Sequence, residues 1–354
     1  MLGEPPEDPL LLFSVLYSFW AASWMAFNGD VVCELAAQFL ALAQKQGATV
    51  PLMVGHRLMG VSLQYVGDPA QGRAHLDRAI AFYDPAVHRP LATRFGADIR
   101  VAILFFRSLS LWLFGYPDAA EVDLDYAIKE AREIGMASTL LPTLSNASLT
   151  HICARNYASA KAEADELCAF ADDKGAAFWK ARGTTHQGSV LALTGSDAEA
   201  VRVLTSGVTA LWSTGGTLLG PSHLAYLARA HAGLGQFDDA WRRTGEAIAA
   251  METTREKWIE PEVYRIAGEI ALMMPASDTA KAEGYFDRAL SVARAQRAKS
   301  WELRTATSLA RLRRDQGKPD AARDLLVPVY DWFTEGFDTP DLKEAKALLE
   351  ELRA

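Results

Sequence analysis

The sequence lacks the short motifs that mark common catalytic and nucleotide-binding sites. It contains no G-x-x-x-x-G-K-[ST] loop, in which backbone amides and a lysine surround the phosphates of a nucleotide. The H-E-x-x-H motif, paired cysteines at zinc spacing and a nucleophile elbow are absent as well. We therefore predict no catalytic residues, no metal site, no cofactor and no enzymatic activity. An enzyme that uses dispersed Arg, His and Glu residues is left as the alternative.

Cysteine and positive charge are also scarce. The three cysteines, Cys33, Cys153 and Cys168, are widely spaced in apolar helical surroundings, so we expect buried free thiols in a reducing cytosol. The chain has 36 Lys and Arg against 44 Asp and Glu, a formal net charge of −8. Such a balance provides no general attraction to nucleic acid or to anionic lipid. We predict a cytoplasmic protein with neither nucleic acid nor membrane as a partner.

Long hydrophobic runs are absent except for one segment near the N-terminus. Leu10–Phe27 has no charged residue over 18 positions, the lower edge of a membrane-span signal. Glu4, Glu7 and Asp8 precede it, whereas a signal peptide begins with positive charge. The segment ends at the turn Asn28–Asp30. We predict that it is a buried first helix of the fold, with a membrane or export segment as the alternative.

What the sequence does contain is a repeat of about 40 residues, marked by small side chains. A small side chain lets two helices cross closely, as a stacked helix hairpin requires. Strand-like alternation of polar and apolar residues is absent. The small residues are Ala22, Gly60, Ser108, Ser148, Gly188, Ala228, Gly268 and Ala310, at intervals of 38, 48, 40, 40, 40, 40 and 42.

Turn signals follow the same period. In six units a glycine lies seven residues after the small residue, where the end of a helix favours a left-handed backbone. Three of the turns place a proline two residues after the glycine, at the first position of the next helix. The glycines are Gly29, Gly67, Gly115, Gly195, Gly235 and Gly317, and the prolines are Pro69, Pro117 and Pro319.

This pattern is a lengthened form of the tetratricopeptide repeat, whose standard unit has about 34 residues. We therefore predict an all-α fold, a right-handed α-solenoid of about eight tetratricopeptide-like helix hairpins with a C-terminal capping helix. Residues 1–9 are predicted to be a disordered acidic and proline-rich lead, 10–337 the solenoid and 338–354 the capping helix. In that helix we expect Thr339 as the cap residue and Glu344 on the solvent face. The first hairpin is the most apolar part of the chain, so we expect one of its faces to dock on another module.

The first helix of each hairpin is expected to line the concave face of the solenoid. Counting from the small residues predicts a groove that is aromatic and polar in its first half and arginine-rich in its second. Arginines there suit the carboxylate or phosphate groups of a peptide or an anionic small molecule. The alternative is an ordinary solvated face of paired charges. The candidate binding residues are Phe105, Trp112, Arg182, Arg229, Glu262, Arg265, Glu269, Arg304, Arg311 and Arg314.

The stretch from Lys299 to Leu352 contains the runs W-E-L-R, S-L-A-R-L and G-F-D-T-P-D-L and the Gly317 turn. In these residues it resembles the C-terminal end of a family of large bacterial regulators. Those proteins carry a class III adenylate/guanylate cyclase or winged-helix domain, then a signalling ATPase domain, then a tetratricopeptide tail. Over the rest of the chain the similarity is one of repeat style. The sequence contains neither a cyclase domain nor an ATPase phosphate loop, so no catalytic residue of the family is carried over.

The resemblance implies a sensory tail of such a regulator, or a relative that has split from one, with the upstream ATPase or cyclase module joining at the N-terminal end. We predict a non-catalytic scaffold that binds a protein or peptide in its concave groove. The alternative is a superhelix that senses an anionic small molecule.

Overall fold

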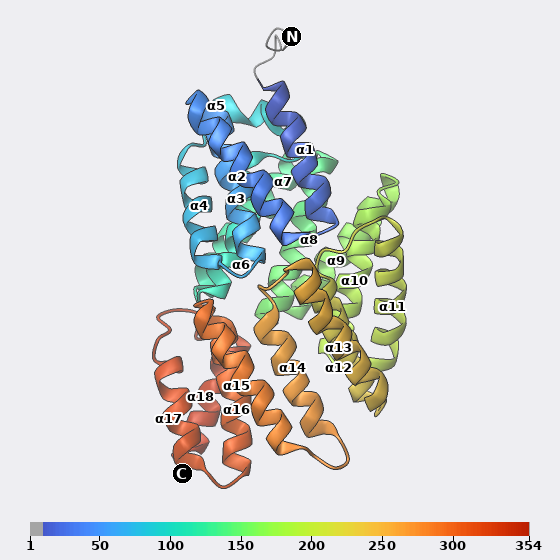
Figure 1. Ribbon diagram of the computed structural model, residues 1–354, viewed down its shortest axis with the longest axis vertical. Helices are drawn as coiled ribbons and strands as arrows, with labels where there is room; N and C mark the ends of the chain where they lie inside the picture. The colour runs from blue at the N-terminus through green and yellow to red at the C-terminus, as the bar shows by residue number, and fades with distance from the viewer. Residues whose placement is uncertain (1–9, 354) are drawn as a thin grey trace.

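The computed structural model describes residues 10–353, apart from the side chains of residues 92 and 93. Over these residues the chain forms eighteen α helices, one short 3-10 helix and no strand (Figure 1). The lead predicted for residues 1–9 lies outside the described residues.

The helices pair into eight successive hairpins, followed by the capping helix α18 (Pro340–Glu351). In the link between α4 and α6 lie α5 (Pro85–His88) and η1 (Arg89–Thr93), which explain the longest repeat interval. The predicted all-α solenoid of about eight hairpins with a cap is confirmed. The hairpins are α1 (Leu11–Met25) with α2 (Gly29–Gln46), α3 (Thr49–Tyr65) with α4 (Pro69–Ala81), α6 (Ile99–Leu113) with α7 (Pro117–Ile134), α8 (Ala137–Ala154) with α9 (Tyr157–Asp173), α10 (Ala177–Leu193) with α11 (Asp197–Ser213), α12 (Gly220–Gly233) with α13 (Phe237–Thr254), α14 (Glu260–Met273) with α15 (Thr279–Ala295), and α16 (Lys299–Asp315) with α17 (Pro319–Tyr330).

The small residues of the repeat lie where the two helices of a hairpin cross. A Cβ atom added to Gly188 on α10 would lie 2.7 Å from the Leu204 side chain and 2.8 Å from its backbone nitrogen on α11. Ala22 departs from this register, because it is exposed on α1. There the predicted register is wrong, since large aromatic side chains such as Trp20 and Trp24 form the buried face of the helix.

Five of the six predicted turn glycines have the expected left-handed backbone, with φ between 73° and 96°. Gly29 does not, because it is the first residue of α2, which is capped by the Asn28 side chain. Its small size is needed for a different reason. A Cβ atom there would lie 2.7 Å from Val66 and 2.8 Å from Arg255. The prediction for Gly29 is therefore wrong about conformation, and close packing accounts for the glycine.

The solenoid coils until later hairpins lie against earlier ones. In Figure 1 helices α1–α7 occupy the upper part, α14–α18 the lower part, and the intervening hairpins join them along one side. The amides of Thr217 and Leu218 donate to the Met25 carbonyl over 3.0 and 3.2 Å. The amides of Lys257 and Trp258 donate to the Tyr65 carbonyl over 2.9 and 3.2 Å. We call this line of contacts between successive superhelical turns the seam.

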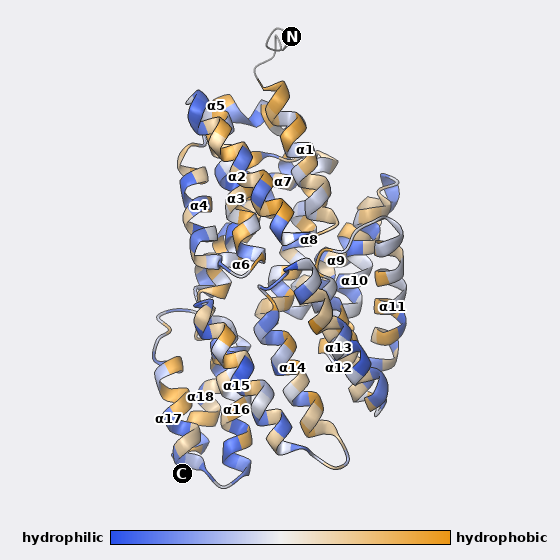
Figure 2. Cartoon of the chain, viewed as in Figure 1, coloured by the Kyte–Doolittle hydropathy of each residue, from blue (hydrophilic) through white to orange (hydrophobic). Residues whose placement is uncertain are grey.

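The outward face of α1 is apolar, as Figure 2 shows by its colour. The buried side chains of the helix are Phe13, Trp20 and Trp24, whereas Leu11, Leu12, Val15, Phe19 and Met25 are 38–61% exposed. The predicted buried first helix is therefore only half buried. None of the helices in the described part of the chain is long and apolar enough to span a membrane.

Replacing Gly188 with leucine should overpack the crossing of α10 and α11. We expect the free energy of unfolding to fall by about 1–3 kcal/mol, because Leu204 and its backbone have no room to move aside. The measurement is denaturant-induced unfolding. The matched control is Gly284→Leu on α15, an exposed helical position with no atom within 4 Å of an added Cβ. Equal stability of the Gly188→Leu variant and the native chain would show that the crossing is not tight.

Candidate functional site

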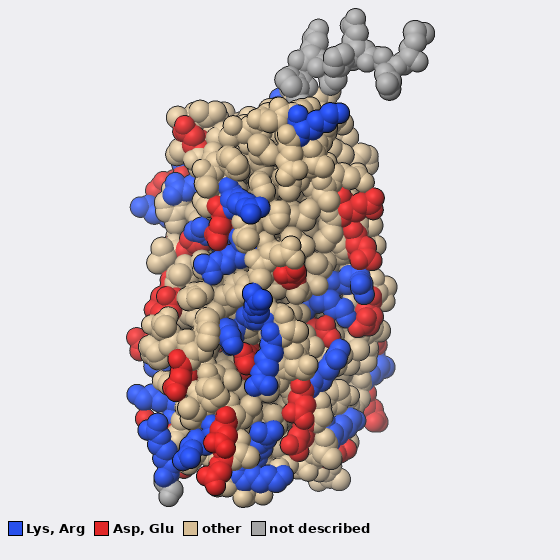
Figure 3. All heavy atoms as spheres, turned by 60° about the vertical axis from the view of Figure 1, so that its left-hand side comes forward, with Lys and Arg blue, Asp and Glu red and all other residues tan. Residues whose placement is uncertain are grey.

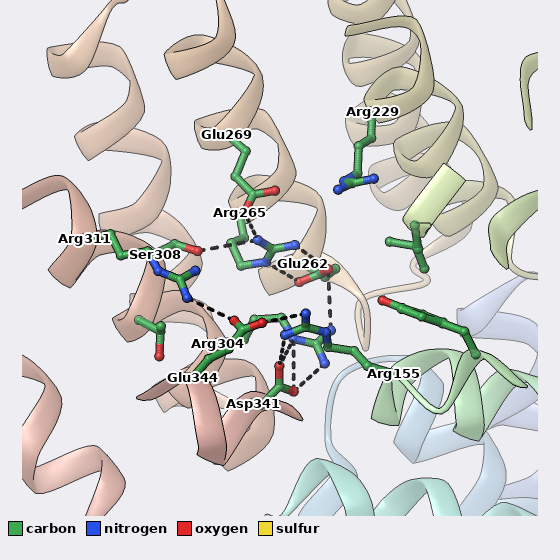
Figure 4. A pocket seen from close by; sticks show the side chains of 13 residues that line it. Arg155, Arg229, Glu262, Arg265, Glu269, Arg304, Ser308, Arg311, Asp341 and Glu344 are labelled. Atoms are coloured by element: carbon green, nitrogen blue, oxygen red, sulfur yellow. Dashed lines mark hydrogen bonds and ion pairs between the residues drawn. The ribbon is translucent and has the colours of Figure 1, made fainter. Parts of the chain in front are cut away.

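A polar cavity of about 170 Å³ lies between the C-terminal hairpins, the capping helix and the α8–α9 turn (Figure 4). We call it the basin. Five arginines and four carboxylates reach it from four helices and one turn, so it is charged on almost every side. Its lining consists of Arg155, Tyr157, Leu193, Arg229, Glu262, Arg265, Glu269, Arg304, Thr307, Ser308, Arg311, Asp341 and Glu344.

One wall of the basin is an ion-pair cluster centred on Asp341, at the start of α18. The Nε atom of Arg304 donates to both Asp341 oxygens, over 3.1 and 3.2 Å. Arg155 donates to Asp341 from the other side over 3.1 Å and to Glu344 over 2.7 Å. Arg311 reaches the second oxygen of Glu344 over 3.1 Å. Because Arg155 belongs to the α8–α9 turn and the other groups to α16 and α18, this cluster ties two superhelical turns together.

A second cluster lies on the inner face of α14. Its members, Glu262, Arg265 and Glu269, follow one another at intervals of about one helical turn. Arg265 holds the buried Glu262 with two parallel hydrogen bonds of 2.6 and 2.7 Å, and it also donates to Glu269. Burial alone would favour the neutral acid, but Arg265 and Arg304 outweigh it and keep the pKa of Glu262 below its ordinary value. Glu262 is therefore an anion whose charge is already compensated within the protein.

Arg229 on α12 differs from the other four arginines of the basin. Its guanidinium donates to the Ala192 carbonyl, and among the described residues it has no carboxylate partner. Figure 4 shows it reaching toward the cavity opposite Arg265 and Glu269, with no interaction drawn to either. Since a fork of N–H donors binds two carboxylate oxygens, Arg229 gives the basin one positive charge that is open to an external anion.

The structure brings six of the ten predicted binding residues into the basin, namely Arg229, Glu262, Arg265, Glu269, Arg304 and Arg311. Three of the others lie elsewhere. Arg314 pairs with Asp315 and Glu351 near the end of α16. Trp112 is 3% exposed and packs edge-on against Trp301, 4.7 Å between ring centroids, so it is a packing residue of the seam. Phe105 lines a separate apolar cavity.

Arg182, the tenth candidate, is 2% exposed and does not line an open groove. It donates to the Leu218 carbonyl over 3.3 Å and to the Ser145 hydroxyl over 3.2 Å. Glu256, also fully buried, accepts from the Leu219 amide over 3.0 Å, and its burial raises its pKa to about 7. The prediction of an accessible groove is wrong here, because the neighbouring hairpins enclose Arg182 through Ser145 and Leu218.

Four charged or aromatic residues of the basin were missed by the counting of repeat positions: Arg155, Tyr157, Asp341 and Glu344. Glu344 was expected on a solvent-facing cap, but it pairs with Arg155 and Arg311. A signal for it did exist in the sequence. Asp341 and Glu344 are three residues apart, on one helix face, and follow a segment rich in arginine. The role of Arg155 could not be read from spacing, since it depends on the superhelical pitch.

No protein-family model matches the sequence, and no curated protein matches it significantly. Similar solved structures exist at low sequence identity. A Rap protein complexed with competence and sporulation factor has a TM-score of 0.58 at 11% identity, covering 96% of this chain and 97% of that one. The Rap conjugation regulator of plasmid pLS20, in complex with the Phr* peptide, has a TM-score of 0.54 at 12% identity, covering 85% and 76%.

A third similar structure is the apo form of the quorum sensor NprR from B. thuringiensis, with a TM-score of 0.51 at 11% identity, covering 90% of this chain and 86% of that one. Similarity at this level of identity establishes the fold. The chain is a helical-repeat protein of the tetratricopeptide-like solenoid class.

Replacing Asp341 with asparagine should leave Arg304 and Arg155 without their shared counterion. The Asp341 and Arg304 side chains are each 11% exposed, so we expect the free energy of unfolding to fall by about 3–5 kcal/mol. Chemical denaturation measures this loss. Asp338→Asn is the matched control, because Asp338 is fully exposed and should leave the unfolding curve unchanged. If the two variants unfold alike, the cluster does not hold the cap to the solenoid.

Proposed function

We propose that this protein is a non-catalytic regulatory scaffold that binds a peptide or protein partner through a carboxylate group held in the basin. The observation that carries the proposal is the state of Arg229, which faces the cavity without a carboxylate partner among the described residues, while its four neighbours are ion-paired. A carboxylate placed there gains a charge-assisted, two-pronged contact. It also meets hydroxyl groups of Thr307 and Ser308 in the same cavity.

The charges around Arg229 favour a peptide over a simple anion. Glu269 lies across the cavity, partly exposed, beside Arg265. A ligand that carries both an anionic and a cationic or N–H group can therefore satisfy Arg229 and Glu269 together. Peptides have both kinds of group. The solved Rap structures of similar fold were captured with a sporulation factor and with the Phr* peptide, which supports this choice.

The position of the basin also suits a regulatory role. Arg155 enters it from an earlier superhelical turn, and Asp341 from the last helix. A ligand in the cavity contacts both sides of the seam, so its binding free energy can favour one relative position of the two turns over another. A ligand that also competes for Arg155 can thus alter the shape of the whole solenoid, whereas an anion on Arg229 alone leaves the seam in place.

The test is a binding measurement with pools of fluorescent random hexapeptides that have either free or amidated C-termini. We expect saturable binding to the native chain and a loss of about ten-fold or more in affinity for the bound peptides in Arg229→Gln, because hydrogen bonds to charged groups are strong. Arg202→Gln is the matched control, since Arg202 is 73% exposed on α11, outside the basin. Binding of small dicarboxylates or phosphate esters but of no peptide would favour the alternative, a sensor of anionic small molecules.

We further propose that the apolar outward face of α1 docks on an upstream signalling ATPase or cyclase module. The exposed side chains Leu12, Val15 and Phe19 follow one another at helical spacing, so they form one continuous stripe. In Figure 3 the upper part of the molecule carries few charged side chains, whereas the lower part is densely charged. The resemblance of the last repeat to bacterial multidomain regulators supports the choice of partner.

This second proposal predicts an ATPase or cyclase coding region in frame with the DNA upstream of the Met1 codon. In the protein encoded by that longer frame, Phe19→Asp should expose the joint between module and solenoid to limited proteolysis. Val122→Asp, at a 69% exposed position on α7, should leave the cleavage pattern unchanged. A stop codon and a ribosome-binding site directly upstream would contradict the fused arrangement.

A further inference from the structure

A second cavity, of about 240 Å³, lies beneath α1 and shares no lining residue with the basin. Helices α1, α3, α6, α8 and α10 all contribute to it. Its walls are mainly aromatic: Trp20, Trp24, Phe105, Phe106 and Trp179. We call it the aromatic pocket. Rings on several sides provide edge and face contacts for a flat aromatic group.

One positive charge enters this apolar space. Arg57 on α3 lines the aromatic pocket and is 3% exposed. Its Nη2 atom donates to the Phe95 carbonyl over 3.3 Å, and its guanidinium lies 5.4 Å from the centre of the Tyr17 ring. Within residues 10–353 no carboxylate forms an ion pair with it. A buried guanidinium without a counterion is costly, so the pocket favours an anion beside Arg57.

Helix α8 adds a hydrogen-bond acceptor to the wall of the pocket. Pro142 lies inside α8 and has no backbone N–H, so the carbonyl of Ser138, four residues earlier, lacks its usual helical donor. Both residues line the aromatic pocket. A ligand with a ring N–H can supply the missing donor.

We infer that the aromatic pocket binds a small aromatic carboxylate, with the ring between the tryptophan and phenylalanine side chains and the carboxylate on Arg57. The cavity is larger than the ~150 Å³ apolar cavity that accepts benzene, and it has room for one ring system with a short acidic side chain rather than for a peptide chain. The fork of Arg57 matches a carboxylate in shape and charge. This inference does not depend on peptide binding in the basin.

The experiment is isothermal titration of the full chain with indole-3-propionate and, separately, with its primary amide. The two compounds have nearly the same shape and share the ring N–H, so they differ chiefly in charge. We expect the acid to bind about ten-fold or more tightly than the amide, the ratio typical of a hydrogen bond to a charged group. In Arg57→Gln the preference should disappear while affinity for the amide is kept.

Two further variants keep the outcome decisive. Arg100→Gln removes another arginine that packs on an aromatic ring, 4.1 Å from the centre of Tyr126 and outside the pocket, and it should bind both compounds as the native chain does. Trp179→Leu shortens the partly buried wall on α10 and should weaken acid and amide by the same factor. It tests the pocket even where Arg57→Gln fails to fold, which circular dichroism would show.

Several results would overturn the inference. These are equal affinity of the native chain for acid and amide, a preference for the acid that persists in folded Arg57→Gln, and no saturable binding of either compound up to millimolar concentration. The tetrapeptide Ala-Ala-Ala-Trp provides a last comparison. If it binds and indole-3-propionate does not, the pocket takes the end of a peptide chain and the assignment of a small molecule is wrong.

Discussion

The contact between successive superhelical turns is the constraint on which the rest of this structure depends. Backbone amides in the α11–α12 and α13–α14 links donate to the carbonyls of Met25 and Tyr65, which end α1 and α3. These carbonyls are the terminal acceptors that a helix leaves unpaired, so the bonds satisfy groups that otherwise need water. With the turns joined in this way, the concave face of the solenoid becomes an interior. Arg182 and Glu256 are buried there, and both bond the backbone of the α11–α12 link, which contacts Met25 across the seam.

Two of the cavities in the closed solenoid have opposite chemistry. Beneath α1 the space is lined by aromatic rings and one arginine, and at the C-terminal end it is lined by arginines and carboxylates. A long peptide cannot lie along the whole inner face, since buried residues such as Arg182 fill it between the two ends. In both of our proposals recognition is therefore local, by a small number of groups in each cavity, and the specificity of each is set by the charges that its walls leave uncompensated.

The repeat could be read from the sequence because it is a local property. Small residues at Gly188 and Gly268 and prolines such as Pro69 mark crossings and helix starts that involve only neighbouring helices. The content of the basin was predictable in part for the same reason: Arg265 and Glu262 share a helix face. The pairing of Arg155 with Asp341 was not, because 186 positions separate them and a small change in twist per hairpin would move them apart. The small twists of successive hairpins add up along the chain, and their sum decides whether the superhelical turns meet. The contact between the turns depends on this sum.

The ion pairs of the basin differ in what their loss would do to the molecule. Asp341 is shared by Arg304, which belongs to its own superhelical turn, and by Arg155, which belongs to an earlier one. An anion that displaces Asp341 from Arg155 removes a link across the seam, and each charge left behind is partly buried and must find a new partner or water. An anion on Arg229 has no such consequence, because Arg229 bonds a backbone carbonyl on the adjacent hairpin. The same cavity can therefore hold one anion with the closed superhelix intact, whereas a competitor for Arg155 acts against closure itself.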